Sequence, residues 1–259
     1  MTTILSSEEE TKLILVGATG KLGKSISQNN SITFGVCSKE NPFLGKVIEN
    51  IQEPLVSSLS EVSLGTKKKF LVIDASYPEN FENVFEFCLK NKIPLVLAST
   101  GHSEEQLKKL EKLSMKVPVL KAPNLSTGIS FFKAQLLKSI ISDISSKVIG
   151  GRLNPTELNI RIIETHHKNK KDAPSGTALD LKEYINKNLK LDFEIEIESI
   201  RDESSVGKHE VIFKIKNEEF KVSHNALSRD IFGEGIIVAL HILKKKPGIY
   251  SVSDLAAHF

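Results

Sequence analysis

The stretch that decides the fold class is KLILVGATGKLG at residues 12–23. Its first half is a short apolar run that predicts a buried strand, and its second half carries glycines at 17, 20 and 23 ahead of a helix-compatible segment. Glycine permits a turn with positive φ and lets the backbone approach a pyrophosphate, which the first N–H groups of the next helix then face. Thr19 stands where the GxGxxG form has its second glycine, so a tight turn without a ligand remains the alternative.

Strands and helices alternate through the rest of the first half. Apolar runs predict four more strands at residues 32–37, 70–75, 94–98 and 117–121. Between them lie two amphipathic patterns, formed by Phe81, Val84, Phe85, Cys88 and Leu89 and by Leu107, Leu110 and Leu113. Apolar strands alternating with such helices predict an α/β fold with a Rossmann-type doubly wound parallel sheet. Its ligands bind beyond the carboxyl ends of the strands, so the polar segments at 74–78, 99–101 and Asn124 are candidates.

The end of the second strand indicates which dinucleotide is used. An acidic residue there binds the ribose hydroxyl of NAD, whereas a basic residue accommodates the 2′-phosphate of NADP. This chain has Ser38 and Lys39 there, with Glu40 one place further on. We therefore expect NADPH to be used at least as well as NADH.

The pattern changes in the second half. A helical pattern from Ser126 (Ile129, Phe132, Leu136, Leu137, Ile140, Ile144) is followed by four runs of period-two alternation. Their apolar positions are Leu158, Ile160, Ile162; Phe193, Ile195, Ile197; Val211, Phe213, Ile215; and Phe220, Val222. They predict a second α+β domain with an open mixed sheet. One face would lie under the helix that begins at Ser175, with Leu179, Leu181, Ile185 and Leu189 inward.

Residues 1–126 and 229–259 are then expected to form the dinucleotide-binding domain, and residues 127–228 the substrate-binding and oligomerisation domain. The helical segment after Arg229 and the tail from Gly248, with a short helix, would return to the first domain. Two crossings of the chain between the domains predict a hinge. Because one helix is little cover for four strands, we expect an oligomer, with a self-covered monomer as the alternative.

Composition excludes several classes of function. The chain is 40% hydrophobic and 26% charged with a formal charge of +3, without the strongly basic balance of a nucleic-acid-binding protein. It has no apolar run long enough for a bilayer, and its first residues lack the features of a signal peptide. Cys37 and Cys88 show no CxxC pattern, which argues against a disulfide framework. We expect a cytoplasmic protein with neither a membrane nor a nucleic-acid partner.

The stretch ETHHKNKKDAPSGTA at 164–178 carries the candidate chemistry. Histidine can donate a proton at neutral pH, and lysines attract an anion. Neighbours on an extended chain point to opposite sides, so His166 and His167 are poorly placed to chelate one metal ion, and we expect no metal. Two exposed polar histidines are the alternative.

A helix start follows in the same stretch. Pro174 disfavours a helical Ala173, and Ser175 is a natural N-cap. The N–H groups around Gly176 and Thr177, with the Thr177 hydroxyl, would then bind an anion. A carboxylate is favoured over a phosphate, because the glycine loop of the first domain already accounts for the phosphates of a dinucleotide.

At these residues the chain resembles the bacterial dihydrodipicolinate reductase family (4-hydroxy-tetrahydrodipicolinate reductases) of lysine and diaminopimelate biosynthesis. The stretch at 164–178 closely matches the long signature of that family. Shorter and individually weak matches extend over the chain: GATGKLG at 17–23, ASTG at 98–101, APNLSTG at 122–128, Arg201 with Gly207 and His209, and HNALSRDIF at 224–232.

The resemblance implies a role for each matched residue. It implies that His166 is the proton donor and Lys170 the cationic partner at the reacting ring. The implied substrate contacts are His167, Ser175, Gly176, Thr177 and Thr100. The implied cofactor contacts are Gly17, Ala18, Thr19, Gly20, Lys21, Leu22, Ala98, Ser99, Thr100, Ala122, Pro123, Asn124, Leu125, Arg229 and Phe232.

The resemblance also implies the reaction and the assembly. A dicarboxylate, 4-hydroxy-tetrahydrodipicolinate, would lose water and receive a hydride at ring C4 from NADPH or NADH, in a two-domain homotetramer. One alternative is a related reductase of another small imine or carbonyl acid, which would not need the carboxylate cradle. Another is a catalytically silent dinucleotide-binding regulator, which would be expected to lack His166 or Lys170.

Overall fold

A computed structural model of the chain describes residues 11–65, 69–189 and 194–256. These residues divide into two compact units. Unit 1 contains Met1–Leu125 and Phe232–Phe259, and unit 2 contains Ser126–Ile231. The chain therefore passes from one unit to the other twice, at residues 125/126 and 231/232.

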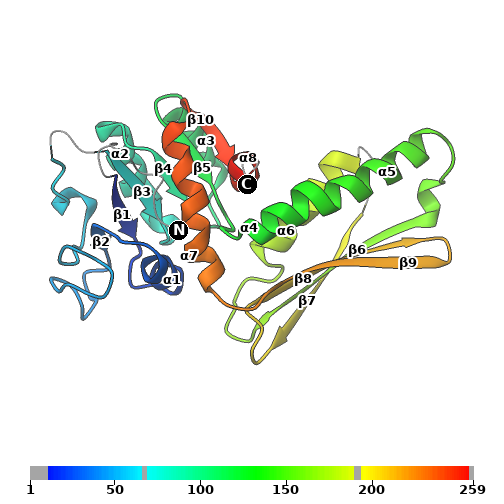
Figure 1. The fold of residues 1–259 in the computed structure, drawn as a ribbon, viewed down its shortest axis with the longest axis horizontal. Coiled ribbons are helices and arrows are strands. Elements are labelled where there is room, and N and C mark those ends of the chain that lie inside the picture. The colour runs from blue at the N-terminus through cyan, green and yellow to red at the C-terminus, as the bar shows by residue number, and fades with distance from the viewer. Residues whose placement is uncertain (1–10, 66–68, 190–193, 257–259) are drawn as a thin grey trace, which may run out of the picture. The chain divides into compact units, whose positions relative to one another are not determined.

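Unit 1 is built on a sheet of six parallel strands in the order β10-β5-β4-β3-β1-β2 (Figure 1). The strands are β1 Lys12–Val16, β2 Phe34–Val36, β3 Phe70–Asp74, β4 Leu95–Leu97, β5 Pro118–Lys121 and β10 Gly248–Ser251. The predicted Rossmann-type doubly wound sheet is confirmed. The sixth strand, β10, comes from the C-terminal tail, where the sequence had indicated only a short helix.

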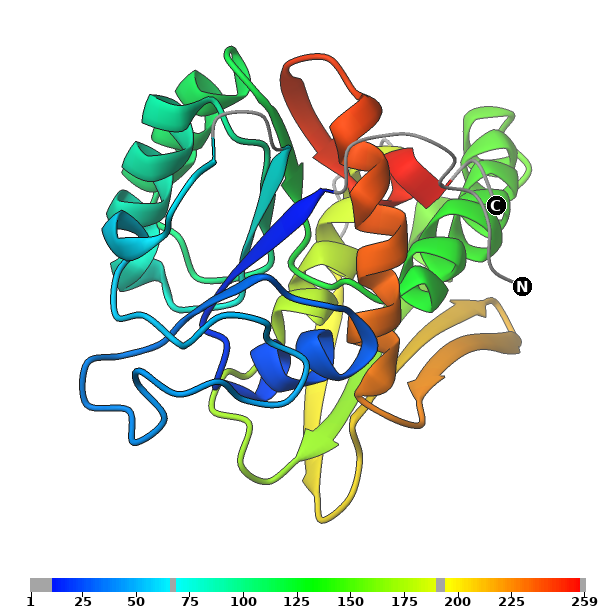
Figure 2. The same cartoon turned by 60° about the vertical axis from the view of Figure 1, so that its left-hand side comes forward.

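Helices cover both faces of this sheet (Figure 2). They are α1 Lys21–Asn29, α2 Phe81–Asn91, α3 Glu104–Ser114, α7 Asp230–Ala239 with the 3-10 turn η5 Leu240–Lys244, and the terminal α8 Val252–Ala256. Side chains of α1, α7 and η5, including Ile26, Ile236 and Ile242, pack on one face. Side chains of α2 and α3, including Phe81, Val84 and Leu110, pack on the other. The strands are short continuous apolar runs because both of their faces are buried.

Unit 2 contains a mixed sheet of four strands in the order β7-β6-β8-β9. The strands are β6 Leu158–His167, β7 Glu196–Asp202, β8 Gly207–Ile215 and β9 Glu218–Ala226. β6 pairs with β7 in parallel and with β8 antiparallel, and β8 and β9 form an antiparallel hairpin. The predicted open mixed sheet is confirmed. Phe193, which the sequence assigned to a strand, lies outside the described residues.

Two helical segments, rather than the single one predicted, cover one face of this sheet. α6 Gly176–Leu189 is one, and the other is a continuous rod of α4 Thr127–Phe131, a π-helical segment η3 Phe132–Leu137, and α5 Lys138–Ile149. Short 3-10 turns complete the two units: η1 Leu59–Glu61, η2 Pro78–Asn80 and η4 Pro155–Glu157.

The π segment corrects one prediction of the core. Leu136 was expected inside but is 41% exposed, whereas Leu137 and Ile141 are buried. A π turn takes one residue more than an α turn, so the buried face moves forward by one position after it. Leu179 was also expected inside and is 50% exposed, because Ala178 and Leu181 supply that part of the buried face of α6.

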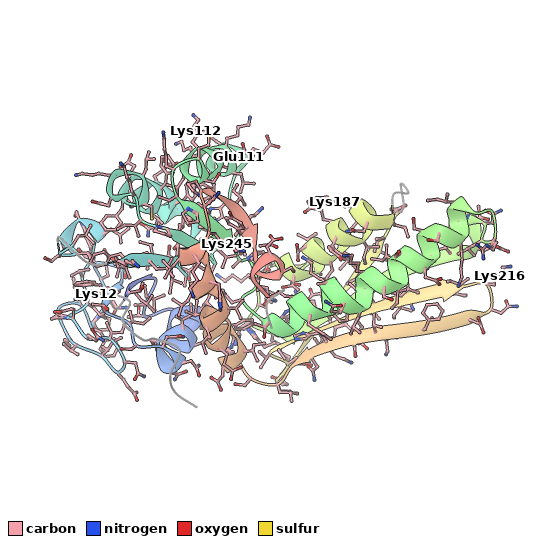
Figure 3. All side chains as sticks on the ribbon, turned by 45° about the horizontal axis from the view of Figure 1, so that its top comes forward. Lys12, Glu111, Lys112, Lys187, Lys216 and Lys245 are labelled. Carbon is pink, nitrogen blue, oxygen red and sulfur yellow. The ribbon has the colours of Figure 1, made fainter. Side chains whose placement is uncertain are left out.

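Charged side chains stand on the periphery of both units. Glu111, Lys112, Lys187 and Lys216 are exposed and point outward in Figure 3. Cys37 and Cys88 are free and buried. In the part of the chain that the structure describes, no helix is long and apolar enough to cross a membrane.

Candidate active site

The strand β6 changes character at its carboxyl end. Ile160, Ile162, Glu164 and His166 alternate on the face beneath the helices, and all four are buried. The first two belong to the apolar core of unit 2, whereas the last two put a carboxylate and an imidazole at the edge of that core. His167 points to the opposite face, as predicted for neighbours on an extended chain.

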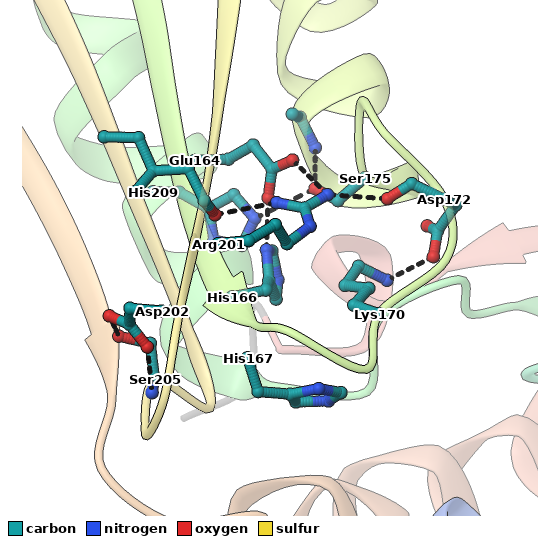
Figure 4. Close-up of polar contacts among 12 residues, drawn as sticks. Glu164, His166, His167, Lys170, Asp172, Ser175, Arg201, Asp202, Ser205 and His209 are labelled. Carbon is teal, nitrogen blue, oxygen red and sulfur yellow. Dashed lines mark hydrogen bonds and ion pairs between the residues drawn. The ribbon is translucent and has the colours of Figure 1, made fainter.

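Glu164 is the centre of a buried polar cluster (Figure 4). One carboxylate oxygen accepts a hydrogen bond from His166 Nδ1, and the other lies 2.9 Å from Nη2 of Arg201 on β7. Burial by itself would raise the pKa of Glu164. The hydrogen bonds from Arg201 and Ser199 and the charge of His166 outweigh that effect and hold the pKa below its ordinary value, so Glu164 is ionised.

His166 and His209 lie edge to face in this cluster, with ring centroids 5.1 Å apart. Burial lowers the pKa of His166; Glu164 opposes the shift, and the positive charges of Lys170 and Arg201 add to it. Burial and the neighbouring His166 lower the pKa of His209 to about 3. His209 is therefore neutral at physiological pH, and its Nε2 lies 3.3 Å from the hydroxyl of Ser175.

Ser175 caps helix α6 as predicted. Its hydroxyl accepts a hydrogen bond from the backbone N–H of Ala178 at 3.2 Å, and it is almost completely buried. Gly176 and Thr177 form the first turn of α6, and the early N–H groups of a helix favour an anion. His209 thus connects the capping residue to the cluster around Glu164.

The loop between β6 and α6 carries Lys170. Its ammonium donates to Asp172 at 2.8 Å, and Arg201 holds the same loop by donating to the carbonyl of Asp172 at 2.7 Å. Burial alone would raise the pKa of Asp172, but the hydrogen bond and positive charge of Lys170, together with the backbone N–H groups of Asp172 and Gly176, outweigh burial and hold that pKa below its usual value. One arginine therefore binds both the buried carboxylate and the lysine loop.

The other charged residues of the stretch behave differently. Lys168 pairs with the exposed Glu203, and Lys171 is exposed. His167 accepts a hydrogen bond at Nε2 from Arg229 at 2.7 Å. The resemblance placed Arg229 near the cofactor and in the first domain, but Arg229 belongs to unit 2. It lies beside His167, which was predicted to contact the substrate.

The spacing in this cluster would by itself suit a metal ion. One ligand atom each from Glu164, His166 and His209 lies within 4.8 Å of the others. Glu164 is already engaged by His166 and Arg201, and the positive charges of Arg201 and Lys170 oppose a cation there. A site without metal remains our prediction.

The glycine loop of unit 1 has the shape expected of a dinucleotide cradle. Gly17 has φ +81°, and a Cβ there would lie 2.6 Å from the carbonyl oxygen of Ala75. A Cβ on Gly23 would lie 2.1 Å from the carbonyl oxygen of Gly17. Only glycine permits this approach, which brings the N-terminus of α1 against the end of β1, where the first N–H groups of a helix suit an anion. The residues present therefore fit a bound pyrophosphate.

The remaining predicted cofactor residues follow the carboxyl ends of the parallel strands. Gly17, Ala18, Thr19, Gly20, Lys21 and Leu22 follow β1, Ser38 and Lys39 follow β2, Ala98, Ser99 and Thr100 follow β4, and Ala122, Pro123, Asn124 and Leu125 follow β5. They therefore lie at one edge of the sheet. Phe232 is partly buried against the apolar core of unit 1. Thr100, predicted to contact substrate, belongs to unit 1, whereas the other predicted substrate contacts belong to unit 2.

The side chain of Ser99 has a structural partner. Its hydroxyl donates to the buried carboxylate of Asp74 at 2.7 Å and lies 3.0 Å from Nε2 of His102. Asp74 also accepts the N–H of Ser76 at 3.0 Å. These bonds tie the ends of β3 and β4 together, so only the backbone of Ser99 remains for a ligand.

Three residues of the unit 2 cluster had no role assigned from sequence: Glu164, Arg201 and His209. One signal was present for Glu164, because the period-two pattern of Ile160 and Ile162 continues into Glu164 and His166 and puts all four on one face. For Arg201 and His209 the family resemblance had singled out the positions, but no local pattern of the sequence brings them to Glu164. They lie beside Glu164 because β7 pairs Arg201 with His166 and β8 pairs His209 with Glu164.

Two family models match this chain. The model described as "Dihydrodipicolinate reductase, N-terminus" matches residues 11–125, and "Dihydrodipicolinate reductase, C-terminus" matches residues 135–256. The 4-hydroxy-tetrahydrodipicolinate reductase of Caldanaerobacter subterraneus subsp. tengcongensis is 35% identical, over 94% of this chain and 97% of its own length. The enzyme of the same name from Clostridium novyi is 35% identical, over 95% and 98%.

A solved structure shares the fold. The dipicolinate-bound dihydrodipicolinate reductase of Paenisporosarcina sp. TG-14 superposes with a TM-score of 0.67 at 21% identity, and covers 93% of this chain and 97% of its own.

Proposed function

The chain belongs to the dihydrodipicolinate reductase family, and we propose that it reduces its substrate with His166 as the proton donor and Lys170 as the cation beside the reacting ring. It is an NAD(P)H-dependent oxidoreductase that reduces 4-hydroxy-tetrahydrodipicolinate in lysine biosynthesis. The observation that carries the residue assignment is the buried cluster of Glu164 and His166, joined through His209 to the N-terminus of α6.

The chemistry of the substrate explains why these groups are gathered. The nicotinamide, when bound, supplies the hydride. Addition of a hydride to a conjugated imine moves electron density to the ring nitrogen, so a proton donor and a nearby cation stabilise the transition state. His166 gives the proton, and the positive charge of Lys170 stabilises the electron-rich ring. Ser175, Gly176 and Thr177 receive a carboxylate at the start of α6, with His167 as a further substrate contact.

In unit 1 the glycine loop and the N-terminus of α1 hold the pyrophosphate, as their glycine-only contacts support. Ser38 and Lys39 lie exposed after β2, where the adenosine ribose of a dinucleotide binds in this fold. We extend the proposal to motion at the two crossings between the units, which would bring Thr100 to the substrate and exclude water.

We also propose that the protein is a homotetramer in the cytoplasm. The face of the unit 2 sheet opposite α5 and α6 carries Ile163, Ile200 and Ile212, which lie outside the apolar cluster that the helices form with the sheet, and Ile200 is 40% exposed. Such a face favours the homotetramer expected from the family resemblance, and light scattering on the purified protein would test it. Two free buried cysteines are in keeping with a cytoplasmic enzyme.

The test of the function follows oxidation of NADPH and NADH with enzymatically generated 4-hydroxy-tetrahydrodipicolinate. His166→Ala should lower kcat by about 10²- to 10⁴-fold, because general acid catalysis contributes about that factor. Lys170→Ala should lower it by about 10²-fold, because it removes a charge at the transition state. Lys171→Ala is the matched control, since Lys171 is exposed in the same loop, and it should stay close to wild type.

Inactivity of the wild type with both cofactors would overturn the assigned reaction. Full kcat in both His166→Ala and Lys170→Ala would overturn the assigned residues while leaving the reaction in place.

A further inference from the structure

Glu164 is the most deeply buried charged group of the site, and neither the proton transfer nor substrate binding uses it directly. Its side chain is fully buried, at the carboxyl end of a strand whose preceding inward residues, Ile160 and Ile162, are apolar. Burying a carboxylate is costly unless it is paired and hydrogen-bonded, and Glu164 meets both conditions through Arg201 and His166.

The contact with His166 involves one particular ring atom. Glu164 is ionised and can only accept, so Nδ1 of His166 must carry a proton. In the part of the chain that the structure describes, Nε2 makes no hydrogen bond, and it lies beside the backbone of Gly207, which has no side chain to cover it. A Cβ on Gly207 would lie 3.1 Å from His166 Nε2 and 3.3 Å from Cδ2.

Arg201 explains why the carboxylate holds its orientation. Its guanidinium lies 2.9 Å from the oxygen of Glu164 that does not face His166, and it also donates to the carbonyl of Asp172 at 2.7 Å. The carboxylate therefore has one oxygen for each partner. An arginine can only donate, so Glu164 has no alternative arrangement that satisfies both neighbours.

We propose that Glu164, held by Arg201, is the positioning residue of the proton donor: it keeps the proton on Nδ1 of His166, presents Nε2 to the substrate, and supplies the negative charge that lets His166 hold its second proton. The inference rests on the proposed role of His166 as proton donor. Glu164 acts only through His166 and touches neither substrate nor cofactor.

The charged groups around His166 determine in which direction the loss of Glu164 would shift the pKa of His166. The titratable and charged groups that face it are Glu164 on β6, Arg201 and Asp202 on β7, His209 on β8, and Lys170 in the loop before α6. Burial, Lys170 and Arg201 oppose a charged imidazole, and Glu164 favours it. Without the negative charge of Glu164, the protonated form of His166 loses its closest support.

Glu164→Gln removes the charge and keeps the size of the side chain. The amide oxygen can face Arg201 or His166 but not both, and if it faces Arg201 the amide N–H₂ points at Nδ1 and opposes its proton. His166 must be protonated to act, so activity is lost as pH rises through its pKa. The variant should lower that pKa and move the falling limb of the kcat/KM profile to lower pH by about one unit or more.

The experiment measures kcat/KM against pH for wild type, Glu164→Gln and Glu164→Asp. At a pH above the limb, Glu164→Gln should lose about tenfold in kcat/KM for each pH unit by which the limb moves, and it should regain activity on the acid side. Glu164→Asp keeps the charge on a shorter side chain, so the falling limb of its profile should lie between those of wild type and Glu164→Gln. Glu210→Gln is the matched control, since Glu210 is another buried carboxylate of the same sheet, paired with Lys208 and Lys221 at 3.0 and 2.8 Å on the opposite face. It should leave the limb in place.

A second readout does not depend on turnover. Histidine labelled with ¹³C at Cε1, assigned by comparison with His166→Ala, should show that His166 titrates at lower pH in Glu164→Gln than in wild type. A loss of activity that is equal at every pH, with an unshifted resonance of His166, would show that Glu164 is only structural and would overturn the inference. Full activity in His166→Ala would instead overturn the proposed role of His166 as proton donor, on which the inference rests.

Discussion

The close approach of Gly23 to Gly17 predicts that Gly23→Ala will release the cofactor. A Cβ at position 23 would lie 2.1 Å from the carbonyl oxygen of Gly17 and 2.9 Å from two backbone atoms of Ala18, whereas ordinary contacts begin near 3.4 Å. All of these are backbone atoms, so no side chain can turn away. Either α1 or the loop must move by about 1 Å, and overpacking of this kind costs about 1–3 kcal/mol of folding free energy.

The same displacement moves the first N–H groups of α1 away from the pyrophosphate. A misplacement of about 1 Å can cost about 10²-fold, so we expect the Kd for NADPH to rise by at least about tenfold, or about 1.4 kcal/mol. NADPH fluorescence titration gives the Kd, and urea unfolding gives the folding free energy. Both measurements use the whole chain.

Gly151→Ala is the control. Gly151 has φ +66° in unit 2, and among the described residues nothing lies within 4 Å of its Cβ position. Gly151→Ala should lower the free energy of unfolding by about 1–2 kcal/mol, because alanine is strained at this positive φ, and it should leave the Kd for NADPH unchanged. If Gly23→Ala binds NADPH as tightly as wild type and unfolds at the same urea concentration, the argument from close approach is refuted.

Three further predictions concern other parts of the molecule. Lys39→Glu should lower kcat/KM for NADPH by about tenfold or more and leave kcat/KM for NADH unchanged, because it replaces a positive charge by a negative one where a 2′-phosphate binds. A wild type that strongly favours NADH would contradict this prediction. The pKa of His209 is lowered to about 3 in the folded protein, whereas in the unfolded chain it is about 6.5. Below about pH 6.5 the unfolded chain therefore binds a proton at His209 that the folded protein does not bind. The free energy of unfolding is unaffected by His209 above that pH and decreases as pH falls below it. His209→Gln should therefore reduce the slope of unfolding free energy between about pH 6 and 4 by up to about 1.4 kcal/mol per pH unit, and an unchanged slope in urea titrations would count against a neutral His209. In Gly207→Ala the new Cβ would lie 3.1 Å from His166 Nε2, so we expect kcat to fall by about tenfold while the Kd for NADPH stays unchanged. An unaltered kcat would show that the ring of His166 can move aside without loss of activity.

Most of the architecture was predictable from local patterns. The run KLILVG and the four apolar runs after it are buried on both faces of a sheet, so their composition alone marked them as parallel strands. Period-two alternation marked three of the strands of the second sheet within a few residues of their observed bounds. Ser175 was recognisable as a helix cap because the N-cap position has a chemical requirement that a short polar side chain meets.

Where prediction failed, the missing information was not local. β10 has only four residues, Gly248–Ser251, and becomes a strand by pairing with β5 more than a hundred positions earlier. Leu136 has the periodicity of a core residue, but a π segment in its own helix turns it outward.

The sequence by itself determined the fold class and the stretch that holds His166 and Lys170, because strand burial, glycine turns and helix caps are each written into a few neighbouring residues. Only the tertiary structure decided how Glu164, Arg201 and His209 meet. They come from three strands, and the register between strands is set by the packing of the whole sheet. His166 is a partner of Glu164 from the same strand, but Arg201 and His209 come from two other strands, so the environment of His166 could be known only once those strands were paired.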